Sequence, residues 1–168
     1  MRKLLPLVAA VALLGNSAVG QTTENSEQLS FRFRTIDVAG AVSTQAFGIN
    51  ERGDVVGNYT DAAGSGHGFR WSNGKFTSID FPGAILTSAR AINDADEIAG
   101  AYSTSDDPNG AHGFILREGK FVVTDFPGSA HSGNLGINES GDITGSYDLG
   151  DINAGHWLFY AEGTLHIF

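Results

Sequence analysis

Three histidines recur at nearly equal intervals, and they are the side chains with the clearest capacity for chemistry. His67, His112 and His156 are separated by 45 and 44 residues. Imidazole is a common ligand for Zn²⁺ and Cu²⁺, and a zinc site places its nitrogens about 2.0–2.1 Å from the ion. Equivalent positions in a symmetric fold would arrange the three rings about one axis, which predicts a metal site. The alternative, which we favour, is that each histidine hydrogen-bonds a neighbouring turn, because duplication copies structural residues.

A second series consists of aspartates. Asp37, Asp80 and Asp125 are separated by 43 and 45 residues. Two carboxylates about 5–10 Å apart can hydrolyse a glycosidic bond, one as the acid and the other as the base or nucleophile. An aspartate ahead of Pro-Gly also caps a turn through its own side chain, and we favour this structural role. We therefore nominate no catalytic residue.

Acidic loops offer a third kind of site. Clustered carboxylate and amide oxygens can coordinate Ca²⁺, which takes about 6–8 oxygen ligands. No loop matches the D-x-[DN]-x-[DN]-G pattern, so we favour solvated loop composition. The sequence requires no cofactor, and Ca²⁺ and Zn²⁺ are the alternatives that these series leave open. The oxygen-bearing residues of three successive loops are Asp61, then Asp106, Asp107 and Asn109, then Asp148, Asp151 and Asn153.

Aromatic residues form the fourth candidate set. Sugars stack on exposed aromatic rings, so one aromatic group in each unit predicts a carbohydrate-binding surface. The alternative is that most of these rings are core, because each strand must bury one face. The candidate ligand-binding residues are Trp71, Trp157, Tyr59, Tyr102 and Tyr147.

All these candidates belong to a longer repeating pattern that must fix their positions. Asn50, Asn93 and Asn138 each end an Ile-Asn pair, at intervals of 43 and 45 residues. Three glycines follow at the same two intervals, and a tyrosine stands two residues after each glycine. Markers in one phase predict three copies of a unit of about 44 residues, a length typical of propeller blades. The glycines are Gly57, Gly100 and Gly145.

Each copy predicts four short antiparallel strands. In the first copy we place them at 46–50, 54–59, 67–71 and 76–81, because valine, tyrosine and phenylalanine favour pleated, half-buried surfaces. Asn73-Gly74 lies between the last two strands and is a strong hairpin signal. No sustained helical periodicity occurs beyond the N-terminal apolar run, so the fold class is all-β.

The motif "DFPG" marks the end of a unit. Asp80–Gly83 recurs letter for letter as Asp125–Gly128. Proline cannot donate to a ladder and glycine accepts a sharp turn, so the motif ends the outer strand. The segment after it (AILTSA) is expected to carry the chain to the next unit. Phe31–Asp37 is left over as one additional outer strand.

The pattern "AFGINERGDVVGNYTDAAGSGHGFRWSNGKFTSIDFPGA" resembles the HAF repeat of bacterial extracellular proteins, which is named for a His-Ala-Phe motif. The resemblance extends from about Phe33 to the C-terminus. His67-Gly68-Phe69 and His112-Gly113-Phe114 differ at the middle residue, and His156-Trp157-Leu158 differs at two positions. The resemblance implies export and a propeller-like array of blades. It implies no established activity and supplies no catalytic residues.

Three units are fewer than the four to eight blades of a closed propeller. We expect three blades of a propeller-like array that associates, so that two chains make six blades and the protein is a homo-oligomer. The alternative is a single chain with threefold pseudo-symmetry, as in a β-prism or a β-trefoil.

The N-terminus predicts export. Arg2 and Lys3 precede the apolar run Leu4–Leu14, and Ala18-Val19-Gly20 provides a cleavage site before Gln21, as in a signal peptide. Eleven apolar residues are too few to span a bilayer. We expect a signal peptide at 1–20, a flexible segment at 21–30, and a three-repeat β domain at 31–168 with units at about 38–81, 82–126 and 127–168. The predicted location is secreted or periplasmic.

Charge limits the partners. Without Arg2 and Lys3, 8 basic side chains face 19 acidic ones, a formal charge of −11. Such a surface repels phosphate backbones and anionic lipid, so we expect no nucleic-acid partner and no membrane insertion. The sequence has no cysteine, which excludes disulfides and thiol nucleophiles.

These observations favour a secreted binding or scaffold module whose ligand is an extracellular carbohydrate or another cell-surface molecule. One alternative is a secreted hydrolase that uses the repeated histidines or aspartates. The other is a surface component whose role is self-assembly.

Overall fold

The computed structural model describes residues 32–150, 156–161 and 164–167, and every regular element among them is a β-strand. The protein is all-β, as the sequence predicts. Thr35–Phe168 forms one compact unit, and the account below concerns the described part of it. Within the described residues, no helix is long and apolar enough to cross a membrane. The predicted signal peptide and the segment 21–30 lie outside the described residues.

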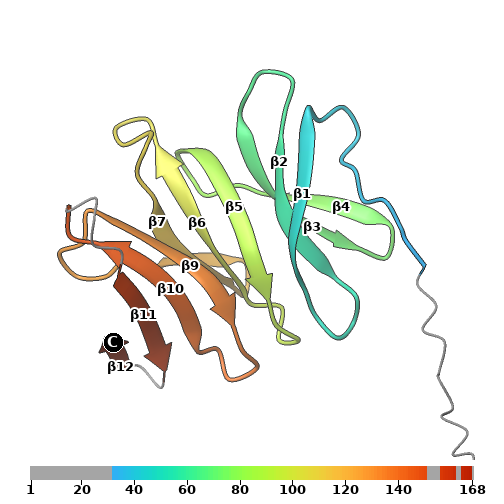
Figure 1. Cartoon of the computed structure of the whole chain (residues 1–168). Coiled ribbons are helices and arrows are strands. Elements are labelled where there is room, and N and C mark those ends of the chain that lie inside the picture. Colours follow the sequence, from blue (N-terminus) through green and yellow to red (C-terminus); the bar gives the residue numbers. More distant parts are fainter. Residues whose placement is uncertain (1–31, 151–155, 162–163, 168) are drawn as a thin grey trace, which may run out of the picture. The chain divides into compact units, whose positions relative to one another are not determined.

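The first four strands follow one another as an antiparallel meander, which we call the first meander (Figure 1). Residues 51–54 and Asn73-Gly74 form two of its reversals, and positive φ values at Asn73 and Gly74 match the predicted hairpin turn. The strands of the first meander are β1 (Ser43–Ile49), β2 (Val55–Thr60), β3 (Gly66–Ser72) and β4 (Lys75–Ile79).

The second meander has the same order and the same antiparallel pairing. Glu118-Gly119 makes its last hairpin turn, again with positive φ at both residues. A parallel contact between Gly66 and Leu86 joins it to the first meander, which gives an eight-stranded sheet. Its strands are β5 (Ala84–Ile92), β6 (Ile98–Thr104), β7 (His112–Arg117) and β8 (Lys120–Val123).

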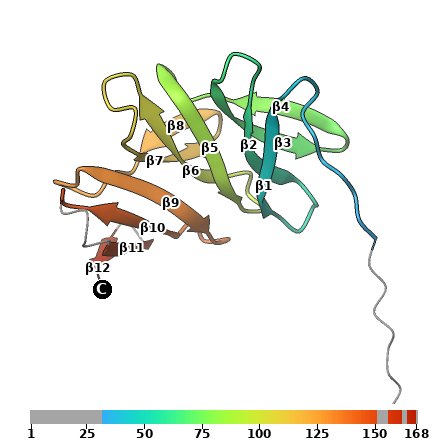
Figure 2. The same ribbon diagram turned by 45° about the horizontal axis from the view of Figure 1, so that its top comes forward.

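The third meander forms a separate four-stranded sheet in the order β12-β11-β10-β9. Its first strand lies beside the second meander in both ribbon views (Figures 1 and 2). The strands are β9 (His131–Ile137), β10 (Ile143–Asp148), β11 (His156–Ala161) and β12 (Thr164–Ile167). Neither sheet of described strands closes on itself, which argues against the β-trefoil alternative, whose core is a closed barrel.

Two expectations about connecting segments are wrong. Residues 32–37, the described part of the proposed additional strand, are not in a strand. The following backbone N–H, that of Val38, bonds the hydroxyl of Thr44 instead of a ladder partner. The segment after the first "DFPG" was expected to be a connection between units, but it is the first part of β5 and pairs with β6 from Ala84 onward.

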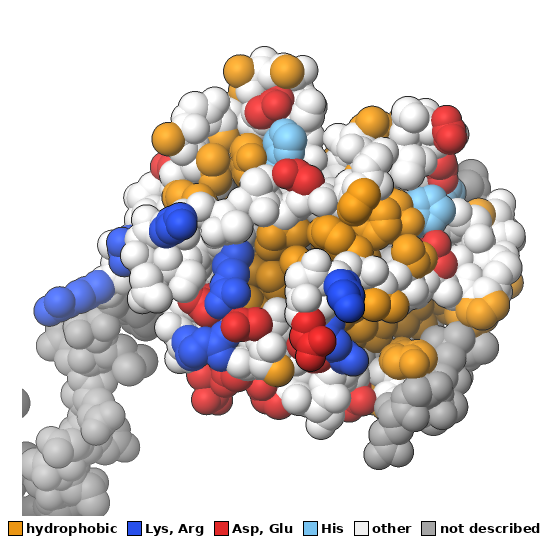
Figure 3. All heavy atoms as spheres, turned by 180° about the vertical axis from the view of Figure 1, so that it is seen from behind, with side chains coloured by type: hydrophobic (Ala, Val, Ile, Leu, Met, Phe, Trp, Pro, Cys, Tyr) orange, Lys and Arg blue, Asp and Glu red, His pale blue; other side chains and the backbone are white. Residues whose placement is uncertain are grey.

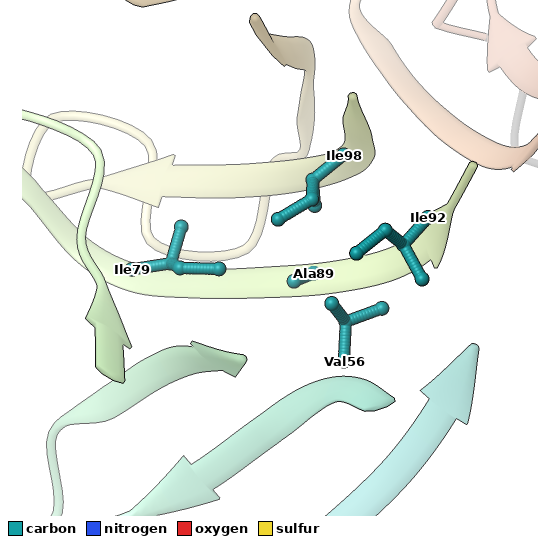
Figure 4. Packing of buried hydrophobic residues seen from close by; sticks show 5 residues of the cluster. All are labelled: Val56, Ile79, Ala89, Ile92 and Ile98. Atoms are coloured by element: carbon teal, nitrogen blue, oxygen red, sulfur yellow. The ribbon is translucent and has the colours of Figure 1, made fainter. Parts of the chain in front are cut away.

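The hydrophobic core lies between consecutive meanders. Val56 and Ile79 of the first meander pack against Ala89, Ile92 and Ile98 of the second (Figure 4). All five side chains are less than a tenth exposed. At roughly 1.5–3 kcal/mol for each large buried aliphatic side chain, this contact stabilises the junction between the two meanders rather than either meander alone.

The next junction is built in the same way. Ala99 and Ile115 of the second meander pack against Ile143 of the third, with Ile137 alongside. Phe81 stacks on Tyr102 and Phe126 stacks on Tyr147, with ring centroids 3.6 and 3.8 Å apart. The phenylalanine of each "DFPG" motif is therefore held by the following meander.

Candidate functional site

His67 is fixed by two aspartates of its own meander. Its Nδ1 lies 2.7 Å from Oδ1 of Asp80 and its Nε2 lies 3.3 Å from Oδ2 of Asp61. The hydrogen bond to Asp80 is the main cause that raises the pKa of His67, while burial acts in the opposite direction and Asp61 adds to the rise. The backbone N–H of Ser65, followed by His67, lowers the pKa of Asp61. This arrangement is the turn-binding role expected of a structural histidine.

His112 repeats the arrangement in the second meander with one change. Its Nδ1 lies 2.9 Å from Oδ2 of Asp125, whose Oδ1 accepts the N–H of Gly113 at 2.7 Å. Its Nε2, however, is 4.0 Å from Oδ2 of Asp107, too far for a hydrogen bond.

His131, at the start of β9, approaches the same carboxylate from the third meander. Its Nε2 lies 3.8 Å from Oδ2 of Asp107, and its Nδ1 lies 2.7 Å from Oδ2 of Asp148. Asp148 also accepts the N–H of Gly150 at 2.9 Å, and that bond, followed by His131, lowers the pKa of the carboxyl. We call Asp107, His112, Asp125, His131 and Asp148 the histidine–aspartate cluster.

The predicted ring of three histidines is not formed. His156 stacks on Tyr147 with ring centroids 5.0 Å apart, while His67 and His112 bond aspartates of their own meanders. As the side chains stand, no group of three or more acidic or histidine side chains in the described part of the chain is close enough to hold a metal ion.

The repeated aspartates and the acidic loops are used for local structure. Asp80 and Asp125 bond histidines of their own meanders rather than pairing with each other, and Asp37 is exposed. Asp61 accepts the backbone N–H groups of Ala63 and Ser65, as an aspartate in a turn does. Of the loop residues proposed for Ca²⁺, Asp151 and Asn153 lie outside the described residues.

The five aromatic candidates fall into different environments. Tyr102 and Tyr147 are 8% and 6% exposed and cannot present a face to a sugar. Burial, followed by Asp125, raises the pKa of Tyr102. Tyr59 stacks on His67 and is half-buried, as is Trp71, whereas Trp157 is 64% exposed. Trp157 therefore has by far the most accessible ring of the five.

An apolar hollow lies between β8 and the third meander. It has a volume of about 380 Å³, and Val122, Val123 and Tyr160 on its wall are 52%, 50% and 38% exposed. Arg117 and Asp125 also line it. Figure 3 shows hydrophobic side chains gathered on one face of the molecule, with basic and acidic side chains beside them. The equivalent hollow between the first two meanders is larger, about 620 Å³, and includes Arg70, Asp80, Asp96 and Glu118 in its lining.

Two parts of the site were not found from the sequence. His131 does not recur, since the corresponding position of the second meander is Leu86, and a search for repeated letters passes over it. Val122 and Val123 line the hollow and follow each other directly on the short strand β8, so the strand lacks the usual alternation of apolar and polar residues there. An unbroken apolar pair on an outer strand was the available signal.

The fold and the site define an all-β protein of consecutive four-stranded meanders, with its polar groups gathered at the junctions between them. No protein-family model matches the chain, and no curated protein matches it either.

Proposed function

We propose that the chain is a secreted binding module built from three copies of one four-stranded unit in a propeller-like array. The proposal is supported by equivalent contacts at both junctions, which recur at the 43- and 45-residue intervals of the sequence. Export rests on the N-terminal residue pattern. Closure of the array by a second chain is part of the same proposal.

The observation that carries a binding role is the apolar hollow beside β8. Its volume is within the range of about 300–1,000 Å³ that is typical of ligand sites, and such sites combine an apolar lining with a few polar groups. Tyr160 provides an aromatic face, and Arg117 and Asp125 provide polar edges. An extracellular carbohydrate has apolar C–H faces and a polar rim, and it is the ligand class that we propose.

The test is binding of the mature protein to a panel of polysaccharides, followed by calorimetry with the tightest ligand. Tyr160→Ala and Val122→Glu should each weaken binding at least tenfold. Thr77→Glu is the matched control, because Thr77 occupies the equivalent place in the hollow between the first two meanders and is also exposed. No binding to any member of the panel, or equal losses in Thr77→Glu and Val122→Glu, would contradict the proposal.

A further inference from the structure

The histidine–aspartate cluster has one histidine and one aspartate more than the equivalent group around His67. At the first junction, His67 bridges two aspartates of its own meander, and the position of the second meander that corresponds to His131 is Leu86. At the next junction, His131 and Asp148 are added together, where the second meander has Leu86 and Ser103. His131 faces the carboxylate of Asp107, and Asp148 bonds the other nitrogen of that histidine.

The hydrogen bonds assign the tautomer of both rings. An ionised carboxylate only accepts hydrogen bonds, so Nδ1 of His112 and Nδ1 of His131 each carry the proton. In the neutral rings, both Nε2 atoms then present lone pairs. A histidine whose Nδ1–H donates to a carboxylate, leaving Nε2 as the donor atom, is the usual arrangement of metal-binding histidines.

Both Nε2 atoms therefore face one carboxylate oxygen. The two Nε2 atoms lie 4.0 and 3.8 Å from the same carboxylate oxygen, Oδ2 of Asp107. With both rings neutral, the nitrogens and this oxygen repel one another when no cation lies between them, and the three aspartates of the cluster add negative charge around them. A cation at this point would remove the repulsion and draw the three atoms inward.

We infer that Asp107, His112 and His131 bind a divalent transition-metal ion, with Zn²⁺ as the natural candidate. Two imidazole nitrogens and one carboxylate oxygen suit zinc, whereas Ca²⁺ and Mg²⁺ prefer oxygen ligands alone. In tetrahedral zinc coordination, neighbouring ligand atoms are about 3.3–3.4 Å apart. The two nitrogen–oxygen spacings to Asp107 exceed that value by about half an ångström. A tetrahedral ion would keep one position open for water or another ligand.

The surroundings allow this contraction. Asp107 is on the loop between β6 and β7, and its side chain is 39% exposed. Its carboxylate lies against Gly110, where a Cβ would overlap the present position of the carboxylate. Asp125 and Asp148 are each held by a backbone N–H and are already oriented to support the two histidines.

The experiment uses the mature protein after treatment with a chelator. Co²⁺ is added and followed by visible absorption, and Zn²⁺ binding is measured by calorimetry. We expect one ion per chain, loss of that ion in His131→Gln and in Asp107→Asn, and affinity about 10–100-fold weaker in Asp148→Asn. His67→Gln is the matched control and should bind as the unaltered protein does. Asp125 is not substituted, because it also lines the hollow proposed for carbohydrate.

Circular dichroism and urea unfolding of each variant separate a lost site from a lost fold. His131 is 42% exposed and Asp107 lies on a loop, so both substitutions should leave the fold intact. Absence of binding by the unaltered protein at micromolar Zn²⁺ overturns the inference. So does equal binding by folded His131→Gln, or an equal loss in His67→Gln. Each result is independent of whether a carbohydrate binds.

Discussion

The side-chain amide of Asn93 donates a hydrogen bond to the backbone carbonyl of Asn138, 45 positions further along the chain, at 3.0 Å. Asn50 donates in the same way to the carbonyl of Asn93, at 3.3 Å. The neighbouring residues repeat the relationship, because Glu51 N–H bonds Asp94 and Asp94 N–H bonds Glu139. A ladder of side-chain-to-backbone bonds thus ties the same turn of the three meanders together.

Asn93 is the member of this ladder whose loss should matter most. It is 1% exposed, and its Oδ1 accepts the N–H of Glu97 while its Nδ2 reaches Asn138. Asn93→Ala leaves buried groups without partners, which costs about 1–3 kcal/mol. Asn138→Ala is the control, since Asn138 is exposed and should cost less. Urea unfolding of both variants measures the difference, and equal losses would show that the ladder adds nothing to the junction.

The repeated glycines make a second prediction. Each faces a bulge in the first strand of its meander, so that a Cβ on Gly100 would overlap the carbonyl oxygen of Ser88 and crowd the ring of Phe114. Gly100→Ala should therefore lower the free energy of unfolding by about 3 kcal/mol, as overpacking of a rigid core does. Gly133→Ala is the control, because its Cβ would meet only Ala101, at an ordinary 3.6 Å.

Thermal and urea denaturation of the two glycine variants decide the matter. The expected order is a large loss for Gly100→Ala and a change within about 0.5 kcal/mol for Gly133→Ala. If both variants were as stable as the unaltered protein, the close approach of β6 to β5 at Gly100 would be wrong.

The spacing of repeated residues predicted the positions of the strands well, but it did not predict what the repeated residues do. Asn93 and Gly100 were found as markers because they recur, yet their tasks depend on a neighbouring meander and on a bulge that alternation of side chains does not indicate. Tyr102 was placed among the surface candidates because its letter alone does not distinguish a buried ring from an exposed one. The stacking of Phe81 on it, across a junction, decided that question.

The histidines show what a search for repeated residues misses. His67 was interpreted as binding a turn, because duplication favours structure, and in the structure it bonds Asp80. His131 was missed for the same reason, since a residue that departs from the repeat carries no weight in a search for repetition. Its meeting with Asp107 joins residues of different meanders, and only the packing of the third meander against the second brings them together.

Acid should weaken the fold through Asp54. This carboxyl is 5% exposed, and hydrogen bonds from Ser72 and then Arg70 lower its pKa to about 2. The unfolded value is 3.8, so the contribution to stability is complete above pH 3.8 and is lost as the pH falls toward 2. Its size is about 1–2 kcal/mol once solvent screening is allowed for.

Urea unfolding between pH 5 and pH 2 tests this assignment. Asp54→Asn should be less stable at pH 5 and should lose less stability on acidification than the unaltered protein. Ser72→Ala should lie between the two, because it removes the largest cause of the lowered pKa. An unchanged acid slope in Asp54→Asn would refute the role given to this carboxyl.

The last prediction compares a buried aromatic candidate, Tyr102, with the most exposed one, Trp157. Tyr102 is 8% exposed and packs between Phe81 and His112, so Tyr102→Ala should cost about 3–5 kcal/mol of unfolding free energy. Trp157 is 64% exposed, and Trp157→Ala should change stability by no more than about 0.5 kcal/mol. Both are measured by urea unfolding followed by circular dichroism, since the indole itself is removed. A Trp157→Ala variant as unstable as Tyr102→Ala would mean that the ring of Trp157 is covered, and that the third meander packs more tightly than its exposed side chains indicate.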